Sequence, residues 1–482
     1  MINSQALPYT RLNFLTKVNL TSIWTTSMSI VAADVFALSA VYWITVIGRY
    51  LLNPNYDLHF YMSLYPVITL FVGAFYIQNL YPGILIHPAE EIRRVFKCVT
   101  IVFLLIALGT FLGHNSDVYS RSIFLIIWAS GAPSILLARH LVRGVLSKQS
   151  WWGIPAVILG QGPCAERVIH TLSKGNIGLR IAGILTDDLS TYSAQGFPPV
   201  LGNLSAAHHW AQNRMAKYVI VALPGKTNSE LRYIIQNFCR SFRHVLLVPD
   251  LPGICSLGIV THEIGGEVGL ELPQRLCHTW ANLTKRLFDL VVSALFLLCL
   301  APIFYLIAVA IKLTSKGPIF FGHSRYGQDG ELFKALKFRT MAQDADQLLA
   351  SHLEAHPEFR AEWERDHKLR KDPRVTLVGR FLRRYSLDEL PQLLNVLLGQ
   401  MSLVGPRPIV KNEIVKYGDG YDLYTRVLPG ITGLWQVSGR NNTTYAERVA
   451  FDEYYVRNWS VWLDLYILTK TVKTVIKAEG AY

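Results

Sequence analysis

Long apolar runs constrain this chain more than any other feature of its sequence. Four of them occupy the first third, at about 28–51, 60–81, 98–112 and 123–138. Each is long enough, or nearly so, to cross a hydrocarbon layer of about 30 Å as a helix. Since 51% of the 482 residues are hydrophobic, we expect a multidomain membrane protein that begins with a four-helix transmembrane bundle, residues 1–148.

Charged side chains predict how these helices are arranged. Lysines and arginines precede the first run, separate the second from the third, and follow the fourth. Such residues collect on the cytoplasmic side, so both ends of the bundle are expected there. The net charge of +13 then reflects anionic lipid or phosphorylated substrates, and we expect no nucleic acid partner. Asp34, inside the first run, is either functional or a hydrogen-bonding contact between helices.

Residues 149–278 predict an α/β domain of Rossmann type. Short apolar strands alternate with helical segments, which is typical of a parallel sheet. The strands are expected at 156–159, 181–185, 218–222 and 245–248. A Gly-x-Gly-x-x-Ala turn starts at Gly160, and Asp187 and Asp188 follow the next strand. This pattern fits a nucleotide phosphate at a helix N-terminus, but Pro163 is unusual there. A regulatory or assembly module is therefore the other interpretation.

A fifth apolar run, 290–311, decides the topology of everything after it. Pro302 lies in its middle, where the missing backbone donor bends a helix. Basic residues flank the run on both sides, which favours a bent, re-entrant helix over residues 283–315 with both ends in the cytoplasm. A straight span with a proline kink is the alternative, and it would export the rest of the chain.

Two adjacent carboxylates, Asp388 and Glu389, stand in an apolar frame behind a run of arginines at 380–384. An acid pair flanked by guanidinium groups suits phosphate chemistry with a divalent metal. The carboxylates would hold the metal or attack phosphorus. The alternative is purely structural, because Ser386 as N-cap and Glu389 three residues later would form a capping box.

Further short motifs surround this pair. They are Lys285-Arg286-Leu287-Phe288-Asp289, residues 333–341, Asp372-Pro373-Arg374-Val375-Thr376, residues 386–392, Gly405-Pro406-Arg407-Pro408, residues 429–433 and residues 436–440. In this order they resemble the bacterial sugar transferases of the monotopic polyprenyl-phosphate phosphoglycosyl transferase family. The apolar runs and the α/β segment make the chain similar to its long-form members. The resemblance implies a mostly helical catalytic domain, residues 279–482.

The resemblance also implies a reaction. A sugar-1-phosphate would move from a UDP-sugar to undecaprenyl phosphate with release of UMP, the first membrane step of O-antigen, capsule or exopolysaccharide synthesis. UDP-galactose is the expected donor, and UDP-glucose is the alternative. Asp388 would attack the β-phosphorus to form an aspartyl-phosphosugar intermediate, and Glu389 would support Mg²⁺ with it. We expect a homodimer in the bacterial inner membrane, with the catalytic domain facing the cytoplasm.

The family pattern assigns further residues. Phosphate oxygens would be bound by Arg339, Arg383, Arg407 and Arg440. The membrane interface and the acceptor site would involve Lys285, Arg286, Asp289 and Pro302, with Asp289 and Arg286 anchoring the re-entrant helix. Asp464 matches an acidic family position whose role is open. Two departures stand out, because the family often has lysine at Arg339 and Ser-Pro where this chain has Ala301-Pro302.

The last apolar stretch, 459–467, fits either a helix in the membrane interface or one packed in a core. It leads into Tyr466 and Lys470, the Tyr-x-x-x-Lys spacing of membrane-bound NAD-dependent nucleotide-sugar dehydratases and epimerases. Those enzymes also join four spans to a Rossmann unit. They are the alternative from a different class, and they require a complete dinucleotide fingerprint.

Overall fold

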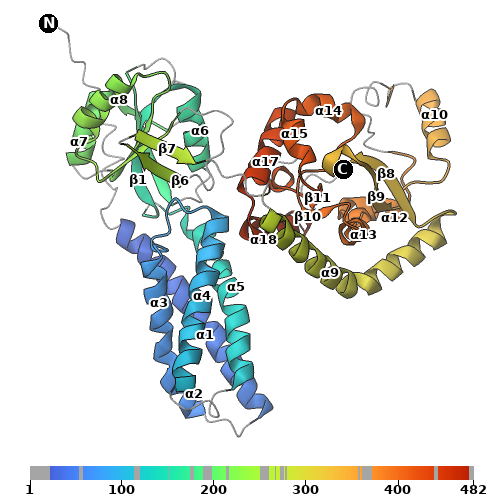
Figure 1. Ribbon diagram of the computed structural model, residues 1–482, viewed down its shortest axis with the longest axis horizontal. Helices are drawn as coiled ribbons and strands as arrows, with labels where there is room; N and C mark the ends of the chain where they lie inside the picture. Colours follow the sequence, from blue (N-terminus) through green and yellow to red (C-terminus); the bar gives the residue numbers. More distant parts are fainter. Residues whose placement is uncertain are drawn as a thin grey trace. The chain divides into compact units, whose positions relative to one another are not determined.

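The computed structural model divides into two compact units, Met1–Pro252 and Gly253–Tyr482, and each is described by itself. The described residues are 22–53, 58–112, 120–149, 151–173, 178–187, 198–212, 216–249, 260–265, 267–271, 276, 279–356, 359–360, 372–438 and 443–476. Figure 1 shows long helices and a sheet in the first unit, and one long helix with many shorter helices and small sheets in the second.

The first unit opens with long apolar helices. They are α1 (Ser22–Leu52), α2 (Leu58–Leu64), α3 (Ile68–Ile77), α4 (Pro88–Leu112) and α5 (Arg121–Leu146). A 3-10 turn joins α2 to α3 without a break. Across the described parts of both units, five helical segments are long and apolar enough to cross a membrane. Four of these segments lie here, which supports a membrane protein.

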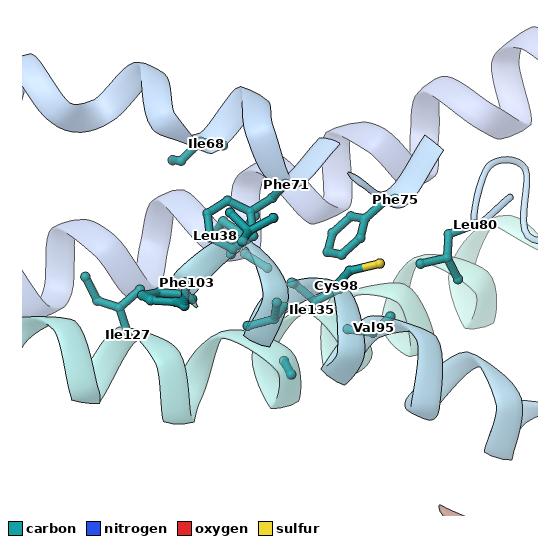
Figure 2. Packing of buried hydrophobic residues seen from close by; sticks show 14 of the residues in the cluster. Leu38, Ile68, Phe71, Phe75, Leu80, Val95, Cys98, Phe103, Ile127 and Ile135 are labelled. Atoms are coloured by element: carbon teal, nitrogen blue, oxygen red, sulfur yellow. The ribbon is translucent and has the colours of Figure 1, made fainter. Parts of the chain in front are cut away.

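The core of these helices is a layer of interlocking apolar side chains. Figure 2 shows Phe71 of α3 beside Leu38 of α1, and Phe75 of α3 beside Cys98 of α4. The ring of Phe71 also lies 5.5 Å from that of Phe103 of α4. The opposite faces carry large exposed apolar groups such as Phe36 and Leu104. Apolar groups that face outward on long helices are expected where the surrounding solvent is lipid.

An ion cluster also lies inside this core. Arg139 of α5 donates to Asp34 of α1 with Nη2–Oδ2 2.6 Å, and to Glu91 of α4 with Nη1–Oε1 2.8 Å. Arg143 donates to Glu91 as well, and the hydroxyl of Tyr81 donates to Asp34. Asp34 therefore serves as a contact between helices, one of its two expected roles.

The α/β part of the first unit is a five-stranded parallel sheet in the order β3-β2-β1-β4-β5. Its strands are β1 (Ile154–Gly160), β2 (Leu179–Leu185), β3 (Val200–Gly202), β4 (Tyr218–Ala222) and β5 (His244–Leu247). The helices are α6 (Gly162–Ser173), α7 (Ala207–Gln212) and α8 (Asn228–Ile234). The Rossmann-type prediction is confirmed at the level of the parallel sheet.

The glycine turn after β1 is shaped by close packing. A Cβ on Gly160 would lie 1.8 Å from the carbonyl oxygen of Ala222 on β4, so only glycine fits there. Asp187, a candidate ribose ligand, accepts a hydrogen bond from the backbone of Leu204. Asp188 lies outside the described residues. The glycine and Asp187 thus both have structural roles in the sheet.

The second unit contains small sheets and many short helices. In chain order its elements are β6 (Val260–Ile264), β7 (Glu267–Glu271), α9 (Thr279–Thr314), β8 (Phe320–Tyr326), β9 (Leu332–Phe338), α10 (Ala345–Ala355), α12 (Leu377–Arg384), η7 (Leu387–Glu389), α13 (Gln392–Leu397), β10 (Ser402–Val404), α14 (Lys411–Tyr417), α15 (Gly420–Thr425), β11 (Gly430–Thr432), α16 (Leu434–Ser438), α17 (Tyr445–Asn458) and α18 (Val461–Ile476). Figure 1 shows α9 as one helix that changes direction along its length, and Pro302 lies inside it.

The second half of α9 packs on β9 and α12. Ile307 and Ile311 form a core with Phe338 of β9 and Leu382 of α12. The last helix, α18, also packs inward, because Leu463 and Ile467 are fully buried. A core-packing face, one of the two interpretations for this stretch, is therefore present in α18.

Candidate active site

Asp388 and Glu389 lie on a tight turn, η7, between α12 and α13. Ser386 precedes them in the left-handed region with φ 55°, and its side chain makes no capping hydrogen bond. The capping-box alternative is therefore wrong. Such a backbone conformation is unfavourable for serine, and here packing compensates for it, because Leu387 and Leu390 both join the core formed with α9.

Lys337 of β9 lies directly against this turn. Its Nζ is 2.7 Å from Glu389 Oε1 and 3.9 Å from Asp388 Oδ2. Side chains alternate along a strand, so Lys337 points to the acid pair while Phe338 enters the core with α9. Lys337 lies within the motif at residues 333–341, but the sequence pattern predicted no role for it.

The two carboxylates have opposite electrostatic environments. Burial raises the pKa of Asp388, and the negative charge of Glu389 adds to this, while Lys337 and Arg383 oppose it. Burial also disfavours the charged form of Glu389, but Lys337, Arg407 and Arg325 outweigh it and hold that pKa below its usual range. Glu389 is thus a stable anion, and Asp388 is a poorly solvated carboxyl next to it.

Arginines surround the pair. Arg383, at the end of α12, donates from Nε to Thr340 Oγ1 at 3.0 Å and interacts electrostatically with Asp388. Arg407 is exposed, and both it and Arg325 of β8 act on Glu389. Arg325 was missed in the sequence because β8 contains no recognisable motif. Arg440 lies outside the described residues.

Glycines hold the backbone around Arg407. Strands β10 and β11 pair in parallel, and Gly405 N donates to Thr432 O at 2.9 Å. A Cβ on Gly405 would lie 2.7 Å from the carbonyl oxygen of Leu428, and one on Gly430 would lie 2.1 Å from Gly405 N. Contacts this short exclude any side chain, which explains the glycines of both motifs.

The start of α9 is fixed by buried charges. Lys285 Nζ donates to Asp464 Oδ2 at 2.8 Å and to Asp289 Oδ1 at 3.3 Å. Asp464 also accepts hydrogen bonds from the Tyr455 hydroxyl at 2.7 Å and the Trp459 indole at 3.1 Å. Burial raises the pKa of Asp464, and Lys285 counteracts this. Asp464 therefore connects α18 to α9.

Arg286, which was expected with Asp289 to anchor the re-entrant helix, contacts α13. Its guanidinium donates to the carbonyl oxygens of Val396 and Leu397, at 2.5 and 3.0 Å, the C-terminal end of α13. A cation there also complements the helix dipole. Because α13 follows the acid pair directly, Arg286 connects the apolar helix to the candidate catalytic turn.

Comparisons with known proteins now bear on this geometry. A family model described as bacterial sugar transferase matches residues 280–478, and a CoA-binding domain model matches residues 81–249. Undecaprenyl-phosphate galactose phosphotransferase of Salmonella typhimurium is 35% identical over 93% of this chain and 94% of its own length. The chain belongs to the bacterial sugar transferase family.

Other relatives act on a different sugar or cover less of the chain. A UDP-glucose:undecaprenyl-phosphate glucose-1-phosphate transferase of Klebsiella pneumoniae is 30% identical over 92% of this chain and 93% of its own. The exopolysaccharide production protein ExoY of Sinorhizobium fredii is 48% identical over 42% of this chain and 89% of its own. Tyr466 and Lys470 of the dehydratase alternative fall within the residues that the sugar transferase model matches.

One candidate phosphate ligand of this sugar transferase lies against α9. Arg339 is 8% exposed, and its Nη2 donates to the carbonyl oxygen and hydroxyl of Ser315 at 2.9 and 2.8 Å. It therefore binds the residue that follows α9, while Arg383 and Arg407 lie beside the acid pair. A phosphate-binding role for Arg339 stays a prediction.

The donor set of the sugar transferase site fits Mg²⁺ only together with a substrate. In the described part of the chain, no three acidic, histidine or cysteine side chains gather as metal ligands. Asp388 and Glu389 offer hard oxygen ligands, although one oxygen of Glu389 already accepts from Lys337. Mg²⁺ is commonly bound by one or two carboxylates plus substrate phosphates, and this site provides that number.

Proposed function

We propose that this sugar transferase moves galactose-1-phosphate from UDP-galactose to undecaprenyl phosphate and releases UMP. The observation that carries the proposal is the turn at Asp388 and Glu389, where two carboxylates face Lys337 amid arginines. The relative named for galactose, 35% identical over 93% of this chain, supports the donor. UDP-glucose is the alternative donor, because a glucose transferase is 30% identical over 92%.

The proposed chemistry has two displacements. A carboxylate oxygen of Asp388 attacks the β-phosphorus of the UDP-sugar, and the bond to the bridging oxygen breaks so that UMP leaves. A phosphate oxygen of undecaprenyl phosphate then attacks the same phosphorus and releases Asp388. Covalent catalysis of this kind divides one difficult step into two, and burial of Asp388 leaves its carboxylate weakly solvated.

The surrounding groups have distinct proposed roles. Lys337 and Glu389 form a fixed pair at 2.7 Å that orients the turn, and Lys337 favours ionised Asp388. Arg383 and Arg407 neutralise diphosphate oxygens. Mg²⁺, held by Asp388 and Glu389, would supply charge neutralisation for the leaving UMP.

The proposed membrane placement follows from α9. A bend at Pro302, the exposed apolar side chains along the helix and the anchors at both ends support a re-entrant helix. The catalytic unit then stays on the cytoplasmic side of the inner membrane, where UDP-sugars occur. We further propose a homodimer, for which the large N-terminal unit offers surface.

The test is UMP release by the purified full-length chain with undecaprenyl phosphate and Mg²⁺. UDP-galactose and UDP-glucose are compared as donors, and Asp388→Ala is the matched variant. If UMP is released with UDP-galactose and this release is lost in Asp388→Ala, the result supports the proposed reaction, the donor and the nucleophile. Release with UDP-glucose alone would change the donor, and no release with either from folded protein would contradict the proposal.

A further inference from the structure

Helix α12 carries a surface that the proposed reaction does not use. Leu377 and Phe381 are 79% and 56% exposed, and Arg380 and Arg384 beside them are also exposed. Each pair is four residues apart, so both lie along one side of the helix. Within the described segments, no ion pair involves either arginine. The surface is therefore apolar with unneutralised positive charge.

The order of side chains around α12 is informative. At about 100° per residue, Val378 and Leu382 form the inner side, which packs with Ile307 and Ile311 of α9. Leu377 and Phe381 come next around the helix, immediately beside that contact. Farther around the helix come the two exposed arginines. Arg383, which interacts with Asp388, lies beyond them. Positive charge thus separates the apolar surface from the site.

We infer that this face of α12 binds the surface of a bilayer that contains anionic phospholipid. The inference rests on the proposed membrane placement of α9, because the apolar surface of α12 continues from its contact with that helix. Leu377 and Phe381 would enter the boundary of the acyl chains, and Arg380 and Arg384 would bind headgroup phosphates.

A neighbouring tyrosine fits the same placement. The ring of Tyr385 lies 5.1 Å from that of Phe381 and 5.8 Å from the Arg384 guanidinium. Aromatic rings with a polar edge are enriched at membrane interfaces. Because α12 leads directly into the turn that holds Asp388, anionic lipid on this face positions Arg383 and the turn, and turnover increases with it.

The first experiment measures lipid binding without reference to catalysis. Native mass spectrometry of the full-length chain in detergent follows titration with phosphatidylglycerol or phosphatidylcholine. The parent chain binds phosphatidylglycerol more tightly, and Arg380→Gln/Arg384→Gln weakens it about 30-fold. Arg426→Gln, at an exposed arginine immediately after α15, is the control and keeps the preference. A parent without preference, or a double variant that keeps it, overturns the inference.

The second experiment links this face to turnover. UMP release is measured in nanodiscs of phosphatidylcholine with or without phosphatidylglycerol. Phosphatidylglycerol raises the rate in the parent and not in the double variant. If the double variant instead raises KM for undecaprenyl phosphate and keeps its phosphatidylglycerol preference, the arginines serve the acceptor and the inference is wrong. A parent without UMP release in any lipid contradicts the proposed function, while lipid binding is judged separately.

Discussion

The chain contains two groups of acids and bases that share residue types and differ in the balance of their charges. In the first unit, Asp34 and Glu91 face Arg139 and Arg143, so the charges balance and every guanidinium nitrogen of Arg139 donates to a carboxylate. In the second unit, the two acids of η7 face an excess of cations, and Lys337 and Glu389 are only partly buried.

This difference distinguishes a structural role for the first group from the catalytic role proposed for the second. A balanced and buried cluster has no capacity left for a ligand, and it connects α1, α4 and α5. Around the weakly solvated carboxyl of the second group, the cations outnumber the anions. The positive charges are therefore balanced only when further anionic groups bind. A nucleotide-sugar diphosphate would supply those groups.

The largest effect is expected from a substitution of Asp388, in the group with excess positive charge. Asp388→Asn keeps the size of the side chain and removes the nucleophile, so UMP release should fall about a thousandfold or more. Initial rates under saturating substrates check this, with Asp422→Asn on α15 as an exposed control that retains full activity. Near-normal turnover in Asp388→Asn would show that this carboxylate does not form the covalent intermediate.

The next prediction tests the balanced cluster. Arg139→Gln leaves the buried carboxylate of Asp34 without its cation, so the variant should lose about 3–5 kcal/mol of stability. Thermal unfolding in detergent measures this. Asp34→Asn/Arg139→Gln should recover part of the loss, because no uncompensated charge remains. An unchanged unfolding temperature in Arg139→Gln would mean that the cluster contributes nothing to holding the helices.

Lys337→Met removes a positive charge beside Asp388 and leaves the Asp388 carboxyl in place. Lys337 lowers the pKa of Asp388, so its loss raises that pKa, and the acid limb of the pH–rate profile moves to higher pH. We expect about a tenfold lower rate near neutral pH. Lys334→Met, an exposed lysine on the other face of β9, is the control, and its profile should match the parent.

Asp452 sharpens the comparison, because this buried acid belongs to neither of the two groups. Burial raises the pKa of Asp452 to about 8, and its described hydrogen bond comes from the Tyr417 hydroxyl at 2.7 Å. The unfolded state ionises above about pH 4 while the folded state keeps its proton, so this group lowers stability as pH rises towards 8.

Asp452→Asn removes that titration. The stability of the variant should therefore depend less on pH between about 4 and 8, and the variant should lose less stability than the parent as pH rises towards 8. Unfolding temperatures across this range check the slope against the parent. Parallel curves for the two proteins would show that Asp452 is ionised in the folded state.

Much of the architecture could be read from local patterns. Apolar runs predicted the long apolar helices, and the alternating segments predicted four of the five parallel strands of the α/β domain to within a few residues, while the short strand β3 was missed. Both signals depend on periodicity and composition, which a single stretch of chain already contains. The family motifs likewise predicted Asp388 and Glu389 as candidate site residues.

The partners of those residues were decided only by the tertiary structure. Lys337 reaches Glu389 across 52 positions of sequence, and Lys285 reaches Asp464 across 179. Ser386 takes a left-handed turn because packing on both sides overrides its capping preference. Local pattern determines which groups are available, whereas charge pairing between distant residues depends on how the elements pack, and no local preference encodes that.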